Sequence, residues 1–259
     1  MLLGHILGVE RLKLYTDPDR PATDLERAAF KELVERAAVH EPVDYLVGRA
    51  PFFAMSFRVS PAVLIPRPST ETVVEHIIQH SRRTPGFHSP LVADVGTGCG
   101  AIAVALAKHA SGSRVIATDV SEQALEVACE NAAAHNVADQ IDFLQGDLLE
   151  PIKQCGRRVR YLAANPPYIS DDEWQDVPPN VKDYEPVTAL RGGVDGLKFI
   201  RPIIAGARDV LDSPGQLVLE IAASQKDAAL KLAHTAGLTN PHVLADHEGL
   251  PRVLVAELT

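Results

Sequence analysis

The residues best suited to chemistry are Asn165-Pro166-Pro167-Tyr168, which follow an apolar run at residues 161–164. Each proline fixes its own φ and lacks an N–H, and a residue that precedes proline is pushed towards an extended conformation. The segment is therefore stiff, and its carbonyls are free to accept hydrogen bonds. The Asn165 amide offers one acceptor oxygen and two donors, and Tyr168 offers a flat face for stacking. Together they could hold a planar group bearing an NH2, either a carboxamide or the exocyclic amine of a base. The alternative is a tight turn that merely ends a strand.

A glycine loop lies upstream, between an apolar run at 91–95 and a helix-forming stretch at 101–109. Its residues are Gly96, Thr97, Gly98, Cys99 and Gly100. Glycines allow the backbone to approach a ligand closely, and the helix behind them begins with unpaired N–H groups. The G-x-G-x-G spacing is not that of a nucleotide phosphate loop. Asp94, at the strand end, suits a cationic or amino-acid-bearing ligand better than a pyrophosphate. S-adenosylmethionine fits, because it carries a ribose, an adenine, a sulfonium and an ammonium but no phosphate; NAD binding or a turn without ligand are the alternatives.

Two further acidic residues follow predicted strands. Asp119 ends a strand over 114–118, about 20 residues after the glycines, where a carboxylate suits a ribose hydroxyl pair. Asp147, which follows a strand over 141–144, would contact the adenine amine, with Leu148 packing on the ring. The alternative for Asp147 is the N-cap of a helix.

Composition limits the class of protein. The chain has 259 residues, with 46% hydrophobic and 23% charged residues, as in ordinary globular proteins. No apolar run approaches the roughly 18 residues that span a bilayer, and no signal-peptide pattern is found. The three cysteines are far apart and form no CxxC, so neither a disulfide framework nor a metal site is predicted, and a reducing cytoplasm is expected. The net charge of −9 argues against a broad grip on nucleic acid.

The elements that must position these residues alternate from residue 91 onward. Residues 1–50 look helical, with Thr23 or Asp24 as a helix N-cap; residues 52–59 read as a strand or hairpin arm, and a helix is expected over 69–80. The later strands are predicted at 91–95, 114–118, 141–144, 159–164, 216–221, 242–245 and 252–257, and the later helices at 100–109, 121–135, 196–211 and 224–236. Such alternation predicts an α/β fold with a parallel-rich sheet covered by helices on both faces. Ligands bind at the carboxyl ends of such strands, where Gly96, Asp119, Asp147 and Asn165 all lie.

With the glycine loop and Asn-Pro-Pro-Tyr in this order, the chain resembles the S-adenosylmethionine-dependent amino-group methyltransferases of the Rossmann-like class. More narrowly, it is similar to the release-factor glutamine methyltransferases (PrmC/HemK), over nearly the whole chain from about Leu2. Further blocks carry this resemblance: Pro42-Val43-Asp44-Tyr45-Leu46-Val47-Gly48, Phe52-Phe53, Val63-Leu64-Ile65-Pro66-Arg67-Pro68, Glu71, Tyr184-Glu185-Pro186, Ala189-Leu190, Asp195-Gly196-Leu197, Leu219-Glu220-Ile221 and Gly249-Leu250-Pro251-Arg252-Val253.

The resemblance implies a Rossmann-like methyltransferase sheet, closed by an antiparallel hairpin, in residues 91–259. It implies a hairpin and linker helix in 51–90, and a small helical substrate-recognition domain in 1–50. That domain is expected to be shortened, because relatives carry about one more helix pair, unless the start codon is misassigned. The implied activity is methylation of the glutamine side-chain amide nitrogen in the Gly-Gly-Gln motif of peptide chain release factors. A cytoplasmic monomer that binds neither nucleic acid nor membrane is expected. The alternatives are a ribosomal-protein glutamine methyltransferase, a DNA or RNA amino-methyltransferase, and a degenerate cofactor-binding or scaffold protein.

In this chemistry the Asn165 side-chain oxygen and the Pro166 carbonyl would accept the NH2 hydrogens of the substrate amide, and Tyr168 would stack on its plane. Pro167 completes the predicted substrate site, and Asn165 also borders the cofactor. No general base is obvious among these residues. Arg67 and Glu71 could pair across one helical turn or shape the pocket floor, and Glu185-Pro186 could be a loop that closes over the substrate or a plain turn.

Overall fold

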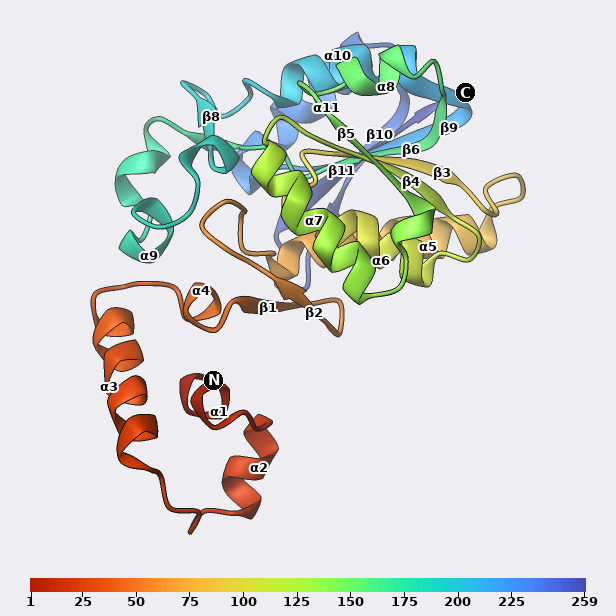
Figure 1. Cartoon of the computed structure of the whole chain (residues 1–259). Helices are drawn as coiled ribbons and strands as arrows, with labels where there is room; N and C mark the ends of the chain where they lie inside the picture. The colour runs from red at the N-terminus through yellow and green to blue at the C-terminus, as the bar shows by residue number, and fades with distance from the viewer.

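The computed structural model describes residues 1–259, apart from the side chain of Arg11. Four helices precede the first hairpin; the first three lie apart from the rest of the molecule, and the fourth lies beside the hairpin (Figure 1). They are α1 (Leu2–Leu7), α2 (Arg11–Thr16), α3 (Asp24–Ala38) and α4 (Val43–Val47). Thr23 begins α3 as predicted: its hydroxyl accepts from the Glu26 N–H, and the Glu26 carboxylate accepts from the Thr23 N–H.

A short hairpin connects the helical unit to the sheet. Its strands, β1 (Arg49–Phe52) and β2 (Met55–Arg58), are joined by Phe53 and Ala54, both with positive φ. The side chains of Phe52 and Phe57 are buried in the same hydrophobic core as α5 (Glu71–Arg83) and α6 (Ala101–His109). The hairpin therefore packs as part of the larger unit.

A seven-stranded sheet in the order β10-β11-β9-β6-β3-β4-β5 forms the centre of the molecule. Strands β9, β6, β3, β4 and β5 are parallel, and β11 runs antiparallel to both β9 and β10. Their bounds are β3 (Leu91–Val95), β4 (Arg114–Asp119), β5 (Ile141–Gln145), β6 (Val159–Ala164), β9 (Leu211–Glu220), β10 (Thr239–Ala245) and β11 (Pro251–Leu258). The predicted α/β class, with its closing antiparallel hairpin, is confirmed.

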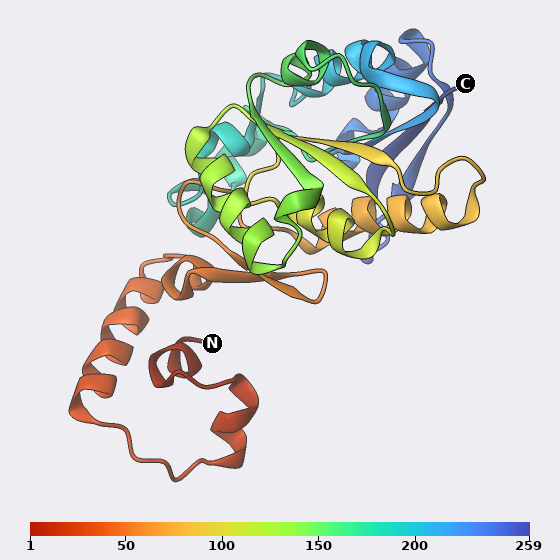
Figure 2. The same ribbon diagram turned by 45° about the vertical axis from the view of Figure 1, so that its right-hand side comes forward.

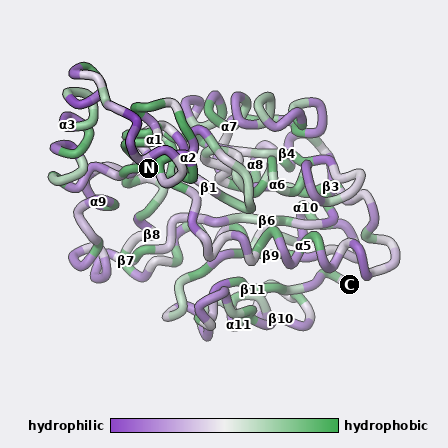
Figure 3. The backbone as a smooth tube through the Cα atoms, turned by 90° about the horizontal axis from the view of Figure 1, so that it is seen from below, coloured by the Kyte–Doolittle hydropathy of each residue, from purple (hydrophilic) through white to green (hydrophobic). Residues whose placement is uncertain are grey.

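Helices cover both faces of this sheet (Figures 1 and 2). One face carries α5, α6 and α7 (Glu122–Ala134); the other carries α8 (Glu150–Gln154), α10 (Ile200–Val210) and α11 (Lys226–Thr235). Hydrophilic and hydrophobic residues alternate along α7 (Figure 3). Its buried residues are mostly apolar, and the helix packs against β4 and β5. Burial on both faces explains why the central strands are mostly apolar.

The segment between β6 and α10 lies beside the carboxyl ends of the strands. It contains β7 (Ile169–Ser170), η3 (Glu173–Asp176), α9 (Pro179–Lys182), η4 (Val187–Ala189) and β8 (Arg191–Gly193). The helix predicted to begin at 196 begins at Ile200, because β8 and the turn after it occupy the preceding residues. The helix predicted from 69 begins at Glu71, after a 3-10 turn at Pro68–Thr70.

No helix among the described residues is long and apolar enough to span a bilayer. In the same residues, no group of three or more His, Cys, Asp or Glu side chains is placed to hold a metal ion.

Candidate active site

Three neighbouring cavities open at the carboxyl ends of the parallel strands. The large cavity, of about 650 Å³, lies between the loops after β3, β4 and β5 and the segment 171–199. The middle cavity, of about 260 Å³, shares Gly96, Val120, Pro167 and Thr188 with the large one. The inner cavity, of about 210 Å³, shares Leu64, Asn165 and Ala189 with the middle one. Asn165 thus stands where the middle and inner cavities meet.

Asp94, which is fully buried, fixes the glycine loop through hydrogen bonds. Its Oδ2 accepts from the Thr97 hydroxyl at 2.6 Å and from the Ala103 N–H at 3.1 Å, while Oδ1 has no partner among the described residues. Burial raises the pKa of this carboxyl to about 7. An unpaired carboxylate oxygen beneath the loop fits a site that receives a cation.

Within the loop, Gly96 and Gly98 line the middle cavity, and their positive φ angles of 71° and 56° favour glycine. Thr97, Cys99 and Gly100 line none of the three cavities. All three are buried, and burial raises the pKa of the Cys99 thiol to about 12. A Cβ at Gly100 would lie 3.1 Å from that of Ala128 on α7. These three residues shape the loop, and any contact they make with a ligand through the backbone remains a prediction.

Asp119 lies half-buried in the wall of the middle cavity. Its Oδ2 accepts from the Gly98 N–H at 2.9 Å and its Oδ1 from the Ser121 N–H at 3.0 Å. Each oxygen keeps a further acceptor position, so the carboxylate remains able to accept hydroxyl donors. Val120, which the sequence analysis did not single out, is 65% exposed and borders both the large and middle cavities.

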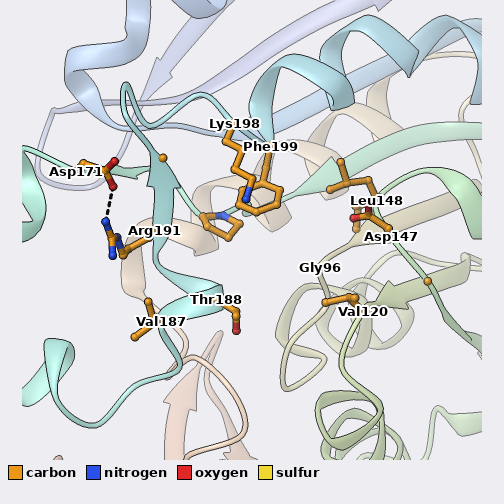
Figure 4. A pocket seen from close by; sticks show the side chains of 14 residues that line it. Gly96, Val120, Asp147, Leu148, Asp171, Val187, Thr188, Arg191, Lys198 and Phe199 are labelled. Atoms are coloured by element: carbon orange, nitrogen blue, oxygen red, sulfur yellow. Dashed lines mark hydrogen bonds and ion pairs between the residues drawn. The ribbon is translucent and has the colours of Figure 1, made fainter.

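Asp147 and Leu148 line the large cavity opposite Lys198 and Phe199 (Figure 4). The alternative role of Asp147 as a helix N-cap is wrong, because α8 has Leu149 at its N-cap position without a side-chain cap. Leu148 has a φ of 47°, an uncommon conformation for a branched side chain that holds it in the cavity wall.

The Asn-Pro-Pro-Tyr segment follows β6 directly, as predicted. Asn165, Pro166 and Tyr168 line the inner cavity, whereas Pro167 lines the other two. The structure thus brings three of the four predicted substrate residues together in the inner cavity, and Pro167 joins Asn165 in the middle one.

Donors and acceptors in this segment are unevenly satisfied. The Asn165 Nδ2 donates to the Thr70 hydroxyl at 3.0 Å, whereas no donor among the described residues reaches Asn165 Oδ1 or the Pro166 carbonyl. The carbonyl of Tyr168 accepts from Gln225 Nε2 at 2.9 Å, which fixes the segment from its far side. Burial, reinforced by Glu220, raises the pKa of the Tyr168 phenol to about 12, so it stays neutral.

The sequence analysis named Glu220 only within a block that carries the family resemblance and gave it no role in the site. It ends β9, is fully buried, and accepts from the hydroxyls of Ser69 at 3.0 Å and Thr70 at 2.6 Å. Burial raises its pKa, because a charged carboxylate is poorly solvated there. A lone acid at the carboxyl end of an apolar strand was the available signal, the same one that singled out Asp119.

Arg67 and Glu71 do not pair with each other, so that interpretation is wrong. The Arg67 guanidinium lies 2.5 Å from the Glu185 carboxylate, which also accepts from the Ile65 N–H at 3.0 Å. Glu71 accepts from the Phe53 N–H at 2.7 Å. Because Glu185 is buried, it fixes the Ile-Pro-Arg-Pro segment beside the inner cavity.

This sheet, with its glycine loop and the Asn-Pro-Pro-Tyr segment at adjacent strand ends, defines a methyltransferase of the Rossmann-like class. Residues 68–177 match the family described as Methyltransferase small domain. Among solved structures, a methyltransferase from Pyrococcus furiosus aligns with a TM-score of 0.58 at 16% identity, over 88% of this chain and 98% of that one. The hMettl16 catalytic domain in complex with the MAT2A 3'UTR hairpin 1 aligns with a TM-score of 0.62 at 16% identity, over 80% of this chain and 75% of that one. At such identities these structures share the fold.

The particular family follows from the whole chain. Residues 1–48 match the family described as PrmC N-terminal domain. The release factor glutamine methyltransferase of Thermodesulfovibrio yellowstonii is 35% identical over 99% of this chain and 90% of its own length. That of Moorella thermoacetica is 39% identical, over 99% and 89%. The chain belongs to the release factor glutamine methyltransferase family.

Proposed function

We propose that this chain methylates the side-chain amide nitrogen of the glutamine in the Gly-Gly-Gln motif of peptide chain release factors, with S-adenosylmethionine as methyl donor. The observation that carries the proposal is the pair of unused acceptors, Asn165 Oδ1 and the Pro166 carbonyl, in a cavity that meets the middle cavity at Asn165. Two unused acceptors on residues that line one cavity suit a group with two N–H donors.

The residues present fit S-adenosylmethionine. The unpaired Asp94 oxygen beneath the glycine loop suits a ligand with an ammonium group. Asp119 would take the ribose hydroxyls, and Asp147, Leu148 and Val120 would surround the adenine. When bound, the cofactor supplies an electrophilic methyl group on a sulfonium centre.

The protein's own task is to orient a poor nucleophile. The lone pair of a carboxamide nitrogen is delocalised into its carbonyl, so proximity alone is insufficient. Asn165 Oδ1 and the Pro166 carbonyl would hold the two N–H groups and stabilise positive charge that develops on the nitrogen. Tyr168, kept neutral by burial, would stack on the amide plane and exclude water. The N–H proton becomes acidic once the nitrogen carries positive charge, so solvent can take it without a dedicated base.

The helical unit also suggests how the substrate protein binds. The helical unit of residues 1–48 would dock the release factor, and the chain would act as a cytoplasmic monomer. The relatives' names and their near-complete alignment support release factors over ribosomal protein or nucleic acid as the substrate.

The test is transfer of labelled methyl from S-adenosylmethionine to purified release factor, followed by mass spectrometry to locate the label. A Gln→Ala version of the Gly-Gly-Gln motif, purified ribosomal protein and DNA serve as alternative acceptors. We expect label only on the glutamine of the intact factor, and none with the Asn165→Ala enzyme. Label on DNA or ribosomal protein, or an unlabelled factor despite cofactor binding, would contradict the proposal.

A further inference from the structure

The hydrogen-bond chain behind Asn165 has only one consistent arrangement of protons when Glu220 is ionised. A carboxylate accepts and cannot donate, so the Thr70 hydroxyl, 2.6 Å from Glu220 Oε2, must give its single hydrogen to it. The Thr70 oxygen then has only lone pairs left. Its contact with Asn165, at 3.0 Å, must therefore be to the amide nitrogen.

This arrangement decides which end of the Asn165 amide faces the substrate. With Nδ2 held by Thr70, Oδ1 is left to the inner cavity as an acceptor. If Thr70 instead gave its hydrogen to Asn165, the amide would turn round and present an NH2 to the NH2 of the substrate. Two donors facing each other form no hydrogen bond, and the orientation of the reacting nitrogen would be lost.

We infer that Glu220, acting through Thr70, is a positioning residue that fixes the Asn165 amide with its oxygen towards the substrate. The inference rests on the proposed function, because it concerns how the same site receives an NH2 group. Glu220 touches no reacting atom. Its ionised form, which the Thr70, Ser69 and Tyr168 hydroxyls and the charge of Arg252 favour, is an acceptor only. The site thereby favours a substrate that donates at this point and disfavours one that accepts.

The other contacts of Glu220 distinguish residues that only bind its carboxylate from the one that also positions the Asn165 amide. Ser69 donates to the other carboxylate oxygen, Oε1, at 3.0 Å but does not contact Asn165. The Tyr168 hydroxyl reaches the same oxygen at 3.5 Å. A substitution at Ser69 therefore removes one hydrogen bond to the Glu220 carboxylate but leaves the Glu220–Thr70–Asn165 chain intact.

The experiment measures kcat and KM for release-factor methylation, together with the dissociation constant for S-adenosylmethionine by calorimetry. Thr70→Val keeps the side-chain shape but removes the hydroxyl. We expect kcat to fall by about tenfold or more, while KM for the factor and cofactor affinity change by less than about threefold. Thr70→Ser restores the hydroxyl and should recover most of the loss. If the valine protein does not fold, Thr70→Cys, with its weak donor, takes its place and is expected to lose kcat in the same way.

The matched control is Ser69→Ala, for which kcat is expected to stay within about threefold of the parent. Glu220→Gln should lose about fivefold, because its amide can offer an NH2 to Thr70 and reverse the chain. Because both residues act in series, the double variant with Thr70→Val should be no slower than Thr70→Val alone.

Unchanged kcat in Thr70→Val, an equal loss in Ser69→Ala, or losses that multiply in the double variant would each overturn the inference. Failure of the proposed function looks different, because the unaltered enzyme would then leave the release factor unlabelled.

Discussion

The ring and the hydroxyl of Tyr168 contribute unequally to the site. Its oxygen lies 3.5 Å from Glu220, at the limit of a hydrogen bond, whereas Thr70 lies 2.6 Å from the same carboxylate. We therefore expect Tyr168→Phe to keep kcat within about threefold and Tyr168→Ala to lower it by about tenfold or more, because only alanine removes the stacking face. Steady-state methylation of the release factor measures both. Equal losses in the two variants would show that the hydroxyl, and not the ring, matters.

Asp94 should make the stability of the protein depend on pH. Its pKa is about 7 in the folded state, against 3.8 ordinarily, because the charged form is poorly solvated when buried. The stabilisation is therefore complete below about pH 4 and is lost as pH rises through 7. Between pH 5 and 8 the further loss is about 3 kcal/mol at most.

The Asp94→Asn variant has no carboxyl group at this position, so its free energy of unfolding should lack this dependence on pH. The free energy of unfolding in urea, measured for both proteins at pH 5 and pH 8, should shift in favour of the asparagine variant at the higher pH. The same difference between the two proteins at both pH values would contradict this account.

At the scale of the elements, the segment after β8 packs tightly on the Asn-Pro-Pro-Tyr strand end. Gly196 has a φ of 72°, and a Cβ there would lie 2.3 Å from both the Tyr168 carbonyl oxygen and Gln225 Nε2. Gly196→Ala should therefore displace Tyr168 and lower kcat by about tenfold or more. It should also destabilise the fold by about 2 kcal/mol.

Gly249 offers a matched control, because its φ is 81° but nothing lies within 4 Å of its would-be Cβ. Gly249→Ala carries the same backbone strain at the tip of the β10–β11 turn and should leave kcat unchanged. Methylation rates and thermal unfolding midpoints of the two variants separate strain from displacement. A Gly249→Ala enzyme as slow as Gly196→Ala would argue that strain alone is responsible.

The local pattern predicted most elements, because strand ends and helix caps depend on neighbouring residues. Thr23 and the strand that precedes Asn165 are examples. The pairing of Glu220 with Thr70 could not be predicted in this way, since 150 residues separate the two and they meet only because α5, which begins just after Thr70, packs against β9. Arg67 shows the same limit. Its sequence spacing suggested a local ion pair with Glu71, whereas its partner in the structure is Glu185, 118 residues away.

Across the molecule, one buried side chain links the glycine loop to the hairpin that lies between the helical unit and the sheet (Figure 1). Asn131 on α7 accepts from the Arg58 N–H at 2.7 Å, and its NH2 donates to the carbonyls of Arg58 at 3.0 Å and Cys99 at 2.8 Å. Every hydrogen-bonding position of the amide except one lone pair is in use. Motion of the hairpin is therefore coupled to the shape of the loop.

Asn131→Ala should destabilise the protein by about 3 kcal/mol, because buried backbone groups lose their partners. Affinity for S-adenosylmethionine should fall by about fivefold as the loop loosens. The neighbouring Glu130→Gln breaks only the exposed ion pair with Arg58 and should cost less than about 1 kcal/mol. Urea unfolding and calorimetry measure both, and unaltered cofactor affinity in Asn131→Ala would refute the coupling.

The arrangement of the three cavities has a consequence for inhibitor design. Because each shares wall residues with the next, one molecule could extend through all of them, passing Asn165 where the middle and inner cavities meet. An adenosine group joined by a short linker to a primary amide would occupy both ends at once. Such a bisubstrate compound would bind through its adenosine and its amide at the same time. Enzymes that recognise only the adenosine would bind it less tightly.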